Sequence, residues 1–353
     1  MTREITFAEA IRESTDQCLA NDPSVYVMGL GVPDPKGIFG TTVGLREKYG
    51  AKRVMDMPVS ENGMTGVAIG SALMGMRPIM THQRIDFMLL SLDQIINNAA
   101  KWYYMFGGQK SVPLVIRLLV GQGWGQGPQH SQSLQTLFAH IPGLKVVMPF
   151  SPYDAKGLLT TSVKDDNPVV FIEHRWLHNL YGEVPVDSFQ VPIGKARIAR
   201  KGKDLTIVSA SYMLVEVLKA ADCLKKDGID VEVVDIRSVK PLDEETIIQS
   251  VMNTGHLMVV DGAWRFLSIS AEIISIVVEN AFKHLKKPPC RVTFPDVPTP
   301  TSWAIANNFY PRAINLLSKV EELLDLPKKN EEEWGLSPTG PLDVPDKSFT
   351  GPF

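Results

Sequence analysis

The stretch DMPVSENGMTGVAIGSALMGMRP, residues 56–78, contains a single ionisable side chain, Glu61, between its terminal Asp and the Arg near its end. Gly, Ala, Met, Val and Ile dominate the residues after Glu61, and this composition predicts a helix over Asn62–Met74 that is buried on most sides. A carboxylate at the head of a buried helix is destabilising unless it is paired or bonds a ligand. Glu61 is therefore the first candidate functional residue.

Two interpretations of Glu61 stay open at this level. In the first, Ser60 caps the helix and Glu61 only interacts favourably with the helix dipole. In the second, Glu61 bonds a ligand, and the small residues behind it allow a planar ligand or another helix to come close. These small residues are Gly63, Gly66, Ala68, Gly70, Ser71, Ala72 and Gly75.

Short β-branched runs alternate with longer helical periods in the first half of the chain, which is typical of parallel βα units in an α/β fold. The first residues of the chain, MTREITFAEAIRE over residues 1–13, are interpreted as the start of a helix. The predicted strands are Val25–Met28, Arg53–Met57, Pro78–His82, Pro113–Leu118, Leu144–Met148 and Val169–Glu173. The predicted helices are Phe7–Ala20, Asn62–Met74, Leu89–Phe106 and Pro152–Lys164.

The alternation loosens over residues 181–203, which are rich in Pro, Gly and Lys, and then restarts. The second set has strands Leu205–Ser209, Val231–Ile236, Leu257–Val260 and Arg291–Phe294, and helices Met213–Lys226, Glu244–Met252 and Ser268–Leu285. We therefore expect two α/β domains, over residues 1–185 and 204–326, with a linker over residues 186–203. Residues 327–353 have few apolar side chains and are predicted to form an extended C-terminal tail.

Composition and charge argue against several classes of protein. The 36 basic residues nearly balance the 39 acidic ones, for a net charge of -3, which predicts no nucleic-acid partner and no membrane surface. The uncharged run Asn62–Met76 is too short and too rich in Gly to span a bilayer. Cys18, Cys223 and Cys290 are isolated thiols, and with no signal segment evident they indicate a cytoplasmic protein.

His130 follows a stretch over residues 121–127 in which Gly alternates with Gln and Trp. Because this stretch lacks the βαβ unit and downstream acid of a dinucleotide fingerprint, we interpret it as a mobile loop. His130 lies just after that loop and after a predicted parallel strand, a position where α/β proteins bind ligands. A lone histidine is more often structural, so both interpretations of His130 stay open.

Several collinear motifs resemble one family over residues 4–326. They are PVSENGMTGVAIGSALMGMRP, LDQIINNAAKWYYMFGG, VPLVIR, GQGPQHSQS, IPGLKVVMPFSPYDAKGLL, DDNPVVFIEH, VVDIRSVKPLDEETI and FPDVPTP. The chain resembles the beta subunit of thiamine-diphosphate-dependent 2-oxoacid dehydrogenases, the decarboxylating component of pyruvate or branched-chain complexes. The resemblance implies a parallel-sheet pyrimidine-binding domain followed by a transketolase C-terminal domain.

The same resemblance implies roles for individual residues. Glu61 matches the family glutamate that hydrogen-bonds the cofactor's aminopyrimidine ring and so helps to activate the thiazolium carbon. Phe87 matches an aromatic that packs against that ring, with ordinary core packing as the alternative, and Gln83 is grouped with it as a cofactor-binding residue. His130 matches a catalytic histidine that faces the substrate.

Metal ions and partners are also implied by the resemblance. A structural potassium ion, held mostly by backbone carbonyls, matches Leu114, Ser162, Val163, Asp165 and Asn167. The family binds magnesium and the diphosphate through a GDG motif on the alpha subunit or an earlier domain, whereas this chain has only VVDGAW over Val259–Trp264. The resemblance therefore implies an alpha subunit in an α2β2 heterotetramer, and a lipoyl acyltransferase core as a further partner.

The chain departs from the family pattern in two places. It has Gly-Leu-Gly over residues 29–31 where relatives usually have an acidic pair, and His82, Gln83 and Arg84 where they have aromatic and apolar residues. The second departure is interpreted either as a solvated strand end or, if His82 and Arg84 line the site, as a preference for a polar or anionic substrate. The identity of the 2-oxo acid stays open.

Three functions therefore remain. In the leading one, the chain and an alpha subunit decarboxylate a pyruvate-like 2-oxo acid and pass the acyl group to a lipoyl domain. In the second, a split transketolase-like or acyloin-forming enzyme passes the enamine intermediate to an aldehyde instead. In the third, the chain is a non-catalytic scaffold, against which the joint retention of Glu61, Phe87 and His130 argues.

Overall fold

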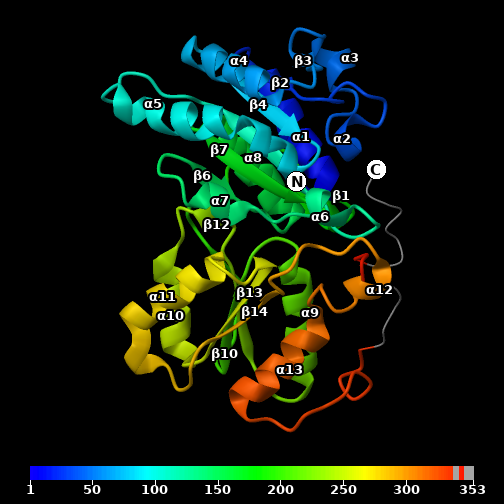
Figure 1. Cartoon of the computed structure of the whole chain (residues 1–353), viewed down its shortest axis with the longest axis vertical. Helices are drawn as coiled ribbons and strands as arrows, with labels where there is room; N and C mark the ends of the chain where they lie inside the picture. The colour runs from blue at the N-terminus through cyan, green and yellow to red at the C-terminus, as the bar shows by residue number, and fades with distance from the viewer. Residues whose placement is uncertain (337–341, 346–353) are drawn as a thin grey trace.

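The computed structural model describes residues 1–336 and 342–345. Two sheets, each flanked by helices, follow one another along the long axis of the molecule (Figure 1). The upper sheet has seven strands in the order β12-β6-β7-β5-β4-β2-β3, and the lower one has five in the order β14-β13-β10-β11-β9. The predicted α/β fold class is confirmed.

The upper half is built mainly from the first part of the chain. Its strands are β1 (Thr2–Thr6), β2 (Val25–Met28), β3 (Val54–Met55), β4 (Arg77–His82), β5 (Val115–Val120), β6 (Lys145–Val147), β7 (Val169–His174) and β8 (Tyr181–Pro185). Its helices are α1 (Phe7–Asn21), α2 (Gly37–Gly40), α3 (Leu45–Tyr49), α4 (Glu61–Leu73), η1 (Ile85–Ser91), η2 (Gln94–Ala99), α5 (Ala100–Met105), α6 (Gly127–His130), α7 (Gln135–Ala139), α8 (Pro152–Lys164) and η3 (Arg175–Leu177).

The lower half follows in the chain. Its strands are β9 (Arg197–Arg200), β10 (Leu205–Ser209), β11 (Val231–Asp235), β13 (Leu257–Trp264) and β14 (Cys290–Phe294), and β12 (Ser238–Lys240) leaves it to join the upper sheet. Its helices are α9 (Met213–Lys226), α10 (Glu244–Thr254), α11 (Ile269–Ala281), η4 (Phe282–His284), α12 (Trp303–Ala306) and α13 (Ala313–Leu324).

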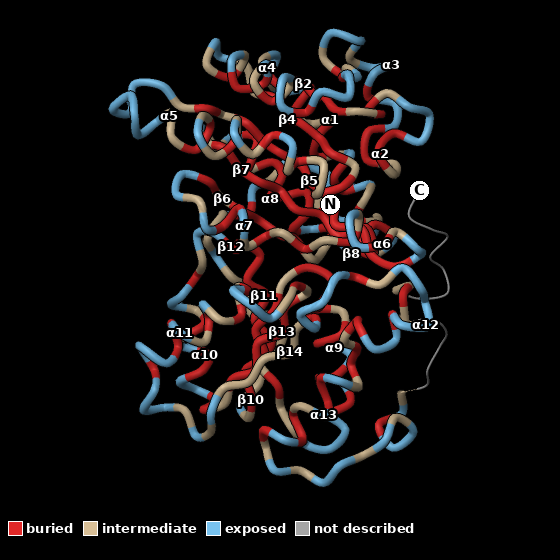
Figure 2. Tube along the Cα trace, in the orientation of Figure 1, coloured by how far each residue is buried: buried red, intermediate tan, exposed pale blue. Residues whose placement is uncertain are grey.

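The central strands of both sheets are buried on both faces because helices cover them. Every residue of β5, β7 and β10 is buried, and Figure 2 shows buried residues concentrated in the strands, with exposed residues on the outer helices and loops. This explains why these strands read as continuous β-branched runs in the sequence. No helix of the described residues is long and apolar enough to cross a membrane.

The N-terminal residues correct one prediction. Residues 2–6 form β1, which pairs antiparallel with β8, so the helix does not begin before Phe7. Thr6 caps α1 through a capping box with Glu9. The capping box sets the helix start locally, but β1 depends on a partner strand far along the chain, which a local pattern does not reveal.

Helix α4 corrects two more predictions. Within this chain, most sides of the helix are not buried. Val67 and the C-cap residue Met74 are 55% and 85% exposed, and Gly63 and Gly70 lie on the same exposed face. Only the opposite face packs against the sheet and η1. Ser60 makes no side-chain capping hydrogen bond, so it does not act as the predicted N-cap.

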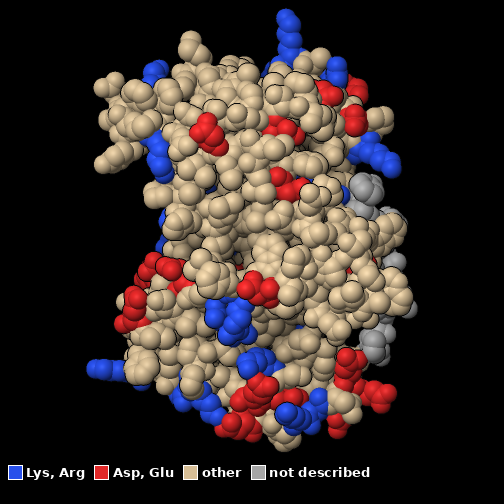
Figure 3. All heavy atoms as spheres, viewed as in Figure 1, with Lys and Arg blue, Asp and Glu red and all other residues tan. Residues whose placement is uncertain are grey.

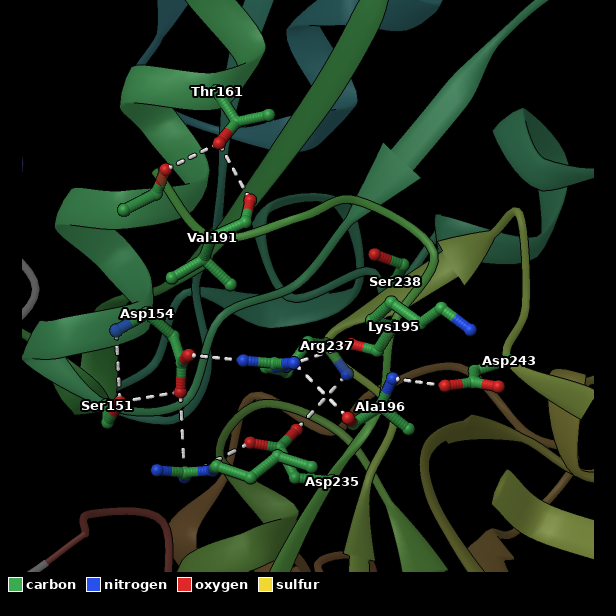
Figure 4. A network of polar contacts seen from close by, with 12 residues as sticks. Ser151, Asp154, Thr161, Val191, Lys195, Ala196, Asp235, Arg237, Ser238 and Asp243 are labelled. Atoms are coloured by element: carbon green, nitrogen blue, oxygen red, sulfur yellow. Dashed lines mark hydrogen bonds and ion pairs between the residues drawn. The ribbon is translucent and has the colours of Figure 1, made fainter. Parts of the chain in front are cut away.

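A polar network joins the two halves where β12 crosses between them (Figure 4). Nη1 of Arg237 donates to Oδ1 of Asp154 on α8 at 3.0 Å, and the backbone N–H of Arg237 donates to Oδ1 of Asp235 at 3.2 Å. Arg197 pairs with Asp154 at 3.5 Å and with Asp235 at 3.4 Å. Both carboxylates are fully buried, so these contacts fix how the two sheets meet.

The Asp235 carboxyl in this network is expected to make stability depend on pH. Burial, together with the nearby Asp154 charge, raises its pKa to about 7. Because the folded pKa exceeds the unfolded value, the folded state binds this proton more tightly, and stability falls as pH rises from about 4 to about 7. We expect Asp235→Asn to remove a slope of up to about 1.4 kcal/mol per pH unit.

Urea unfolding between pH 5 and 8 measures that slope. The exposed Asp187→Asn variant is the matched control and should keep the wild-type slope. If the free energy of unfolding depends on pH in the same way in wild type and in Asp235→Asn, Asp235 does not carry the buried proton.

Candidate functional site

The candidate residues gather at the carboxyl edge of the upper sheet, where open α/β sheets bind ligands. Strand β4 ends at His82 and leads directly into η1, which carries Asp86 and Phe87. The neighbouring parallel strand β5 ends at Val120 and leads into the glycine-rich loop and α6, which ends at His130. Parallel pairing of β4 with β5 therefore brings two distant segments of the sequence together.

Glu61 opens α4 and is 6% exposed. Its backbone carbonyl accepts a hydrogen bond from the Thr65 hydroxyl at 2.7 Å, as part of the helix. Within residues 1–336 and 342–345 no group is seen to donate to its carboxylate, whose oxygens are not among the fully enclosed atoms that lack a partner and so keep some contact with solvent. Helix α4 packs against η1, which carries Phe87. A carboxylate that keeps this contact can accept a hydrogen bond from a group outside the chain, as the predicted ligand contact requires.

His130 is positioned by two side chains of η1. Its Nδ1 lies 2.9 Å from Oδ2 of Asp86, and its ring meets that of Phe87 edge-on at 5.6 Å between centroids. A carboxylate at Nδ1 favours the tautomer with the proton there, which leaves Nε2 as the acceptor. The sequence reasoning missed Asp86, although an acid two residues after the His82–Arg84 departure was a usable signal.

His82, Gln83 and Arg84 do not form a solvated strand end. His82 and Arg84 are 3% and 5% exposed, and burial lowers the pKa of His82 to about 4, so its imidazole is neutral at physiological pH. Nε2 of Gln83 donates to the Leu30 carbonyl at 3.1 Å, and Oδ1 of Asp56 accepts from the Gly31 N–H at 2.9 Å. The two departures from the family pattern therefore touch one another.

The glycine-rich loop is anchored, contrary to the prediction that it is mobile. The Gly123 N–H donates to the Tyr310 hydroxyl at 3.1 Å, and the Trp124 N–H donates to Oδ2 of Asp343 at 3.1 Å. Gly123 has a φ of +70°, and a Cβ there would lie 1.6 Å from the Asp343 carbonyl oxygen, so glycine is required.

The described part of the C-terminal segment is docked. Asp343 contacts the glycine-rich loop, and Trp334 is buried with its Nε1 donating to Oε1 of Glu321 at 3.0 Å. The prediction of an extended tail over residues 327–353 also covers residues 337–341 and 346–353, which lie outside the described residues.

Several of the carbonyls assigned to potassium already accept hydrogen bonds. Nη1 of Arg77 donates to the carbonyls of Val163 and Asp165, each at 3.1 Å. The Leu114 carbonyl accepts from Val169 at 2.9 Å, the Ser162 carbonyl from Asp165 at 3.3 Å, and the Asn167 N–H donates to Oδ1 of Asp165 at 2.9 Å. A guanidinium thus occupies part of this cluster, so a potassium ion would have to share carbonyls with it.

Magnesium has no evident side-chain site here. Among the described residues, no group of three or more His, Cys, Asp or Glu side chains is arranged to hold a metal ion. Asp261, in the VVDGAW string, instead accepts from Nε2 of Gln135 at 3.1 Å, and burial raises its pKa to about 6.

Comparisons with known proteins identify both halves. Residues 3–179 match the transketolase pyrimidine binding domain, and residues 194–313 match the transketolase C-terminal domain. A solved structure described as a split gene transketolase, inactive beta4 tetramer, superimposes with a TM-score of 0.73 over 92% of this chain and 99% of that one. Its sequence identity of 21% supports the fold alone.

Curated relatives are similar over nearly the whole chain. The beta subunit of acetoin:2,6-dichlorophenolindophenol oxidoreductase from Cupriavidus necator is 43% identical, covering 92% of this chain and 98% of the relative. The mitochondrial pyruvate dehydrogenase E1 component subunit beta from Bos taurus is 40% identical, covering 92% and 91%. The corresponding subunit from Rickettsia felis is 40% identical, covering 91% and 98%. The chain therefore belongs to the family of beta subunits of thiamine-diphosphate-dependent 2-oxoacid dehydrogenases.

Proposed function

We propose that this chain, together with an alpha subunit, decarboxylates a pyruvate-like 2-oxo acid and transfers the acyl group to a lipoyl domain. The observation that carries the proposal is the position of Glu61, a residue only 6% exposed at the head of α4, whose carboxylate is not seen to accept a hydrogen bond from the described residues. When bound, thiamine diphosphate supplies the electron sink for decarboxylation.

Glu61, Phe87 and Gln83 form the proposed cofactor contacts of this chain. The Glu61 carboxylate accepts a hydrogen bond from a ring nitrogen of the aminopyrimidine and stabilises a proton held there. Phe87 offers an apolar ring beside the aminopyrimidine. The edge-on contact of Phe87 with His130 sets the orientation of both side chains. Gln83 is tied to the Leu30 carbonyl, which orients its amide.

His130 is the proposed proton-handling residue on the substrate side. Asp86 holds its Nδ1, which leaves Nε2 as the nitrogen that accepts or returns a proton. The imidazole is partly exposed, with 43% of its side chain accessible, as a group that meets an incoming substrate or lipoyl arm must be.

An apolar surface on the upper half supports the proposed α2β2 heterotetramer. Figure 3 shows that this face is mostly uncharged over α4 and α5, whereas charged side chains gather at the lower end. Helix α4 packs against η1 and η2, and η2 packs against α5. Residues on or beside α4, η1 and α5 expose large apolar side chains, and such patches mark protein interfaces. The exposed residues are Val59, Val67, Met74, Leu90, Tyr103, Tyr104, Met105 and Phe106.

Some finer points of the proposal rest on the resemblance alone. They are the magnesium ion and diphosphate held by the alpha subunit, the potassium ion at the carbonyls beside Arg77, and a lipoyl acyltransferase core as partner. A cytoplasmic location is proposed instead from the isolated thiols of Cys18, Cys223 and Cys290. The proposed domain boundaries, at residues 1–185, 186–203, 204–326 and 327–353, are likewise kept as predictions.

In a second candidate function, an aldehyde takes the place of the lipoyl domain as the reaction partner. The 43% identical relative is named for acetoin, a hydroxyketone, which favours a site that also handles the carbon–carbon bond of an acyloin. In that case the acyl unit moves to or from an aldehyde, and a lipoyl domain is not required.

Cofactor binding tests the split site. Alone, the chain is expected to bind thiamine diphosphate with magnesium about a hundredfold more weakly than when co-expressed with its alpha subunit, since it lacks the charge-assisted contacts to the diphosphate. Titration calorimetry measures both affinities. Equal and tight binding by the isolated chain would overturn the proposal, whereas carbon dioxide release from 2-oxo acids by the assembled enzyme, with an artificial electron acceptor, would support it.

A further inference from the structure

A cavity of about 470 Å³ lies at the edge of the lower sheet that β14 forms. This volume is within the usual range for sites that bind small molecules. The cavity is lined by β14, by α11 and α13, and by residues just after β13 and just before β14. Among the described residues that line it, none belongs to the candidate functional site at the upper sheet.

Three basic side chains from different elements converge on this cavity. Arg265 follows β13, Arg291 lies in β14 and Lys319 lies on α13. In Figure 3, basic side chains gather over the part of the lower half where β14 runs in Figure 1. Among the described residues, no Asp or Glu lines the cavity.

The three positive charges act on one another. Burial, and after it the charge of Arg265, lowers the pKa of Arg291. The hydrogen bond to Glu322 raises the pKa of Lys319, and the charge of Arg265 opposes that increase. Like charges that lie this close raise each other's free energy, and an anion bound among them lowers it.

The negative charges near this group are few. Glu322 pairs with Lys319, but these side chains are 54% and 39% exposed, so the pair is weak. Burial raises the pKa of the Cys290 thiol to about 11, so the thiol is neutral at physiological pH. Within residues 1–336 and 342–345, neither arginine of the cavity pairs with a carboxylate, and Nη1 of Arg291 donates to the Arg265 carbonyl at 3.3 Å. Three cations against one carboxylate leave two positive charges in excess.

The rest of the lining is mostly apolar. Ala271 and Ile274 come from α11, and Pro289 precedes β14. All three are partly exposed, so they are accessible from the cavity. A ligand that fills the cavity therefore contacts cations on one part of its surface and carbon atoms on another.

We infer that Arg265, Arg291 and Lys319 bind the phosphoryl group of a small phosphorylated molecule whose organic part packs against Ile274 and Pro289. Guanidinium groups bind phosphoryl oxygens by paired, charge-assisted hydrogen bonds, and an ammonium group adds a point charge. A phosphate monoester is largely a dianion at neutral pH, which matches the excess of two positive charges. This site lies apart from the proposed catalytic site and does not depend on the proposed reaction.

Binding of phenyl phosphate to the full chain, measured by titration calorimetry, is the first test. Arg265→Gln and Arg291→Gln should each weaken binding by about tenfold to a hundredfold, because each removes charge-assisted hydrogen bonds. Arg46→Gln, which removes the same charge at an exposed position on α3, should bind as wild type does. Arg265 is also exposed, so Arg265→Gln keeps the test decisive even if Arg291→Gln does not fold. Equal affinity in wild type, Arg265→Gln and Arg46→Gln, or no binding by wild type, would overturn the site.

Two further ligands test the chemical class. Inorganic phosphate should bind more weakly than phenyl phosphate, and Ile274→Ala should reduce this difference. Equal affinity for both ligands in wild type would show a site for free phosphate and contradict the organic part of the inference. A peptide of four glutamates should bind most weakly, and tighter binding of this peptide that is lost in Arg265→Gln would reassign the cavity to an acidic protein partner. These titrations need neither thiamine diphosphate nor an alpha subunit, so they are decided separately from the proposed function.

Discussion

Glu61→Gln is expected to leave the fold and the assembly with an alpha subunit intact but to lower turnover by about a hundredfold to ten-thousandfold, the range for losing a positioned acid or base. The amide has the shape of the carboxylate, so α4 and its packing on η1 should persist. It lacks the negative charge that stabilises a protonated ring nitrogen, and so the proton transfer that the carboxylate assists fails.

The measurement is steady-state turnover of the assembled enzyme together with its mass in solution. Glu47→Gln, the same chemical change at an exposed position on α3, is the control and should behave as wild type. If Glu61→Gln retains activity within a few-fold of wild type, Glu61 is only a helix-start residue facing the dipole.

Glu173→Gln is expected to cost about 3–5 kcal/mol of folding free energy, because it leaves a buried positive charge without its partner. Oε1 and Oε2 of Glu173 accept from Nε and Nη2 of Arg117 at 2.6 Å and 3.0 Å, and both side chains are fully buried. Burial by itself would raise the pKa of Glu173, but Arg117 and His178 hold it below its usual value, so the group is ionised in the folded protein. Urea unfolding of the chain measures the loss.

The double variant Arg117→Met with Glu173→Leu keeps this test decisive even if Glu173→Gln does not fold. Removing both charges should recover more than half of the lost stability, since apolar replacements of buried pairs are often neutral. A loss below about 1 kcal/mol in Glu173→Gln would place this pair among ion pairs of little consequence.

Local periodicity predicted the regular elements well wherever the pattern is complete within the element. Helices α8 and α9 begin and end at the predicted residues, as do strands β2 and β10. Each of these elements buries a continuous or periodic apolar face, so the sequence of the segment contains its own signal.

Elements stabilised by distant partners were missed. The predictions contain neither β1, which pairs with β8, nor β12, which pairs with β6 of the other half. The predicted helix over Leu89–Phe106 is in fact divided among η1, the π-helix η2 and α5. Short strands and local changes of helical hydrogen bonding depend on neighbours that a window of sequence does not include.

By itself the sequence determined the α/β class, the order of the main elements and, through its motifs, the family and the carboxylate at the head of α4. Those follow from apolar periodicity and from residue types that are readable one segment at a time. Only the tertiary structure decided that Asp86 contacts His130 and that Asp343 occupies the space left by Gly123. It also decided that the guanidinium groups of Arg84 and Arg175 both lie over the Phe39 ring. Contacts of that kind are set by how parallel strands align and how the loops after them converge, and no single segment contains that information.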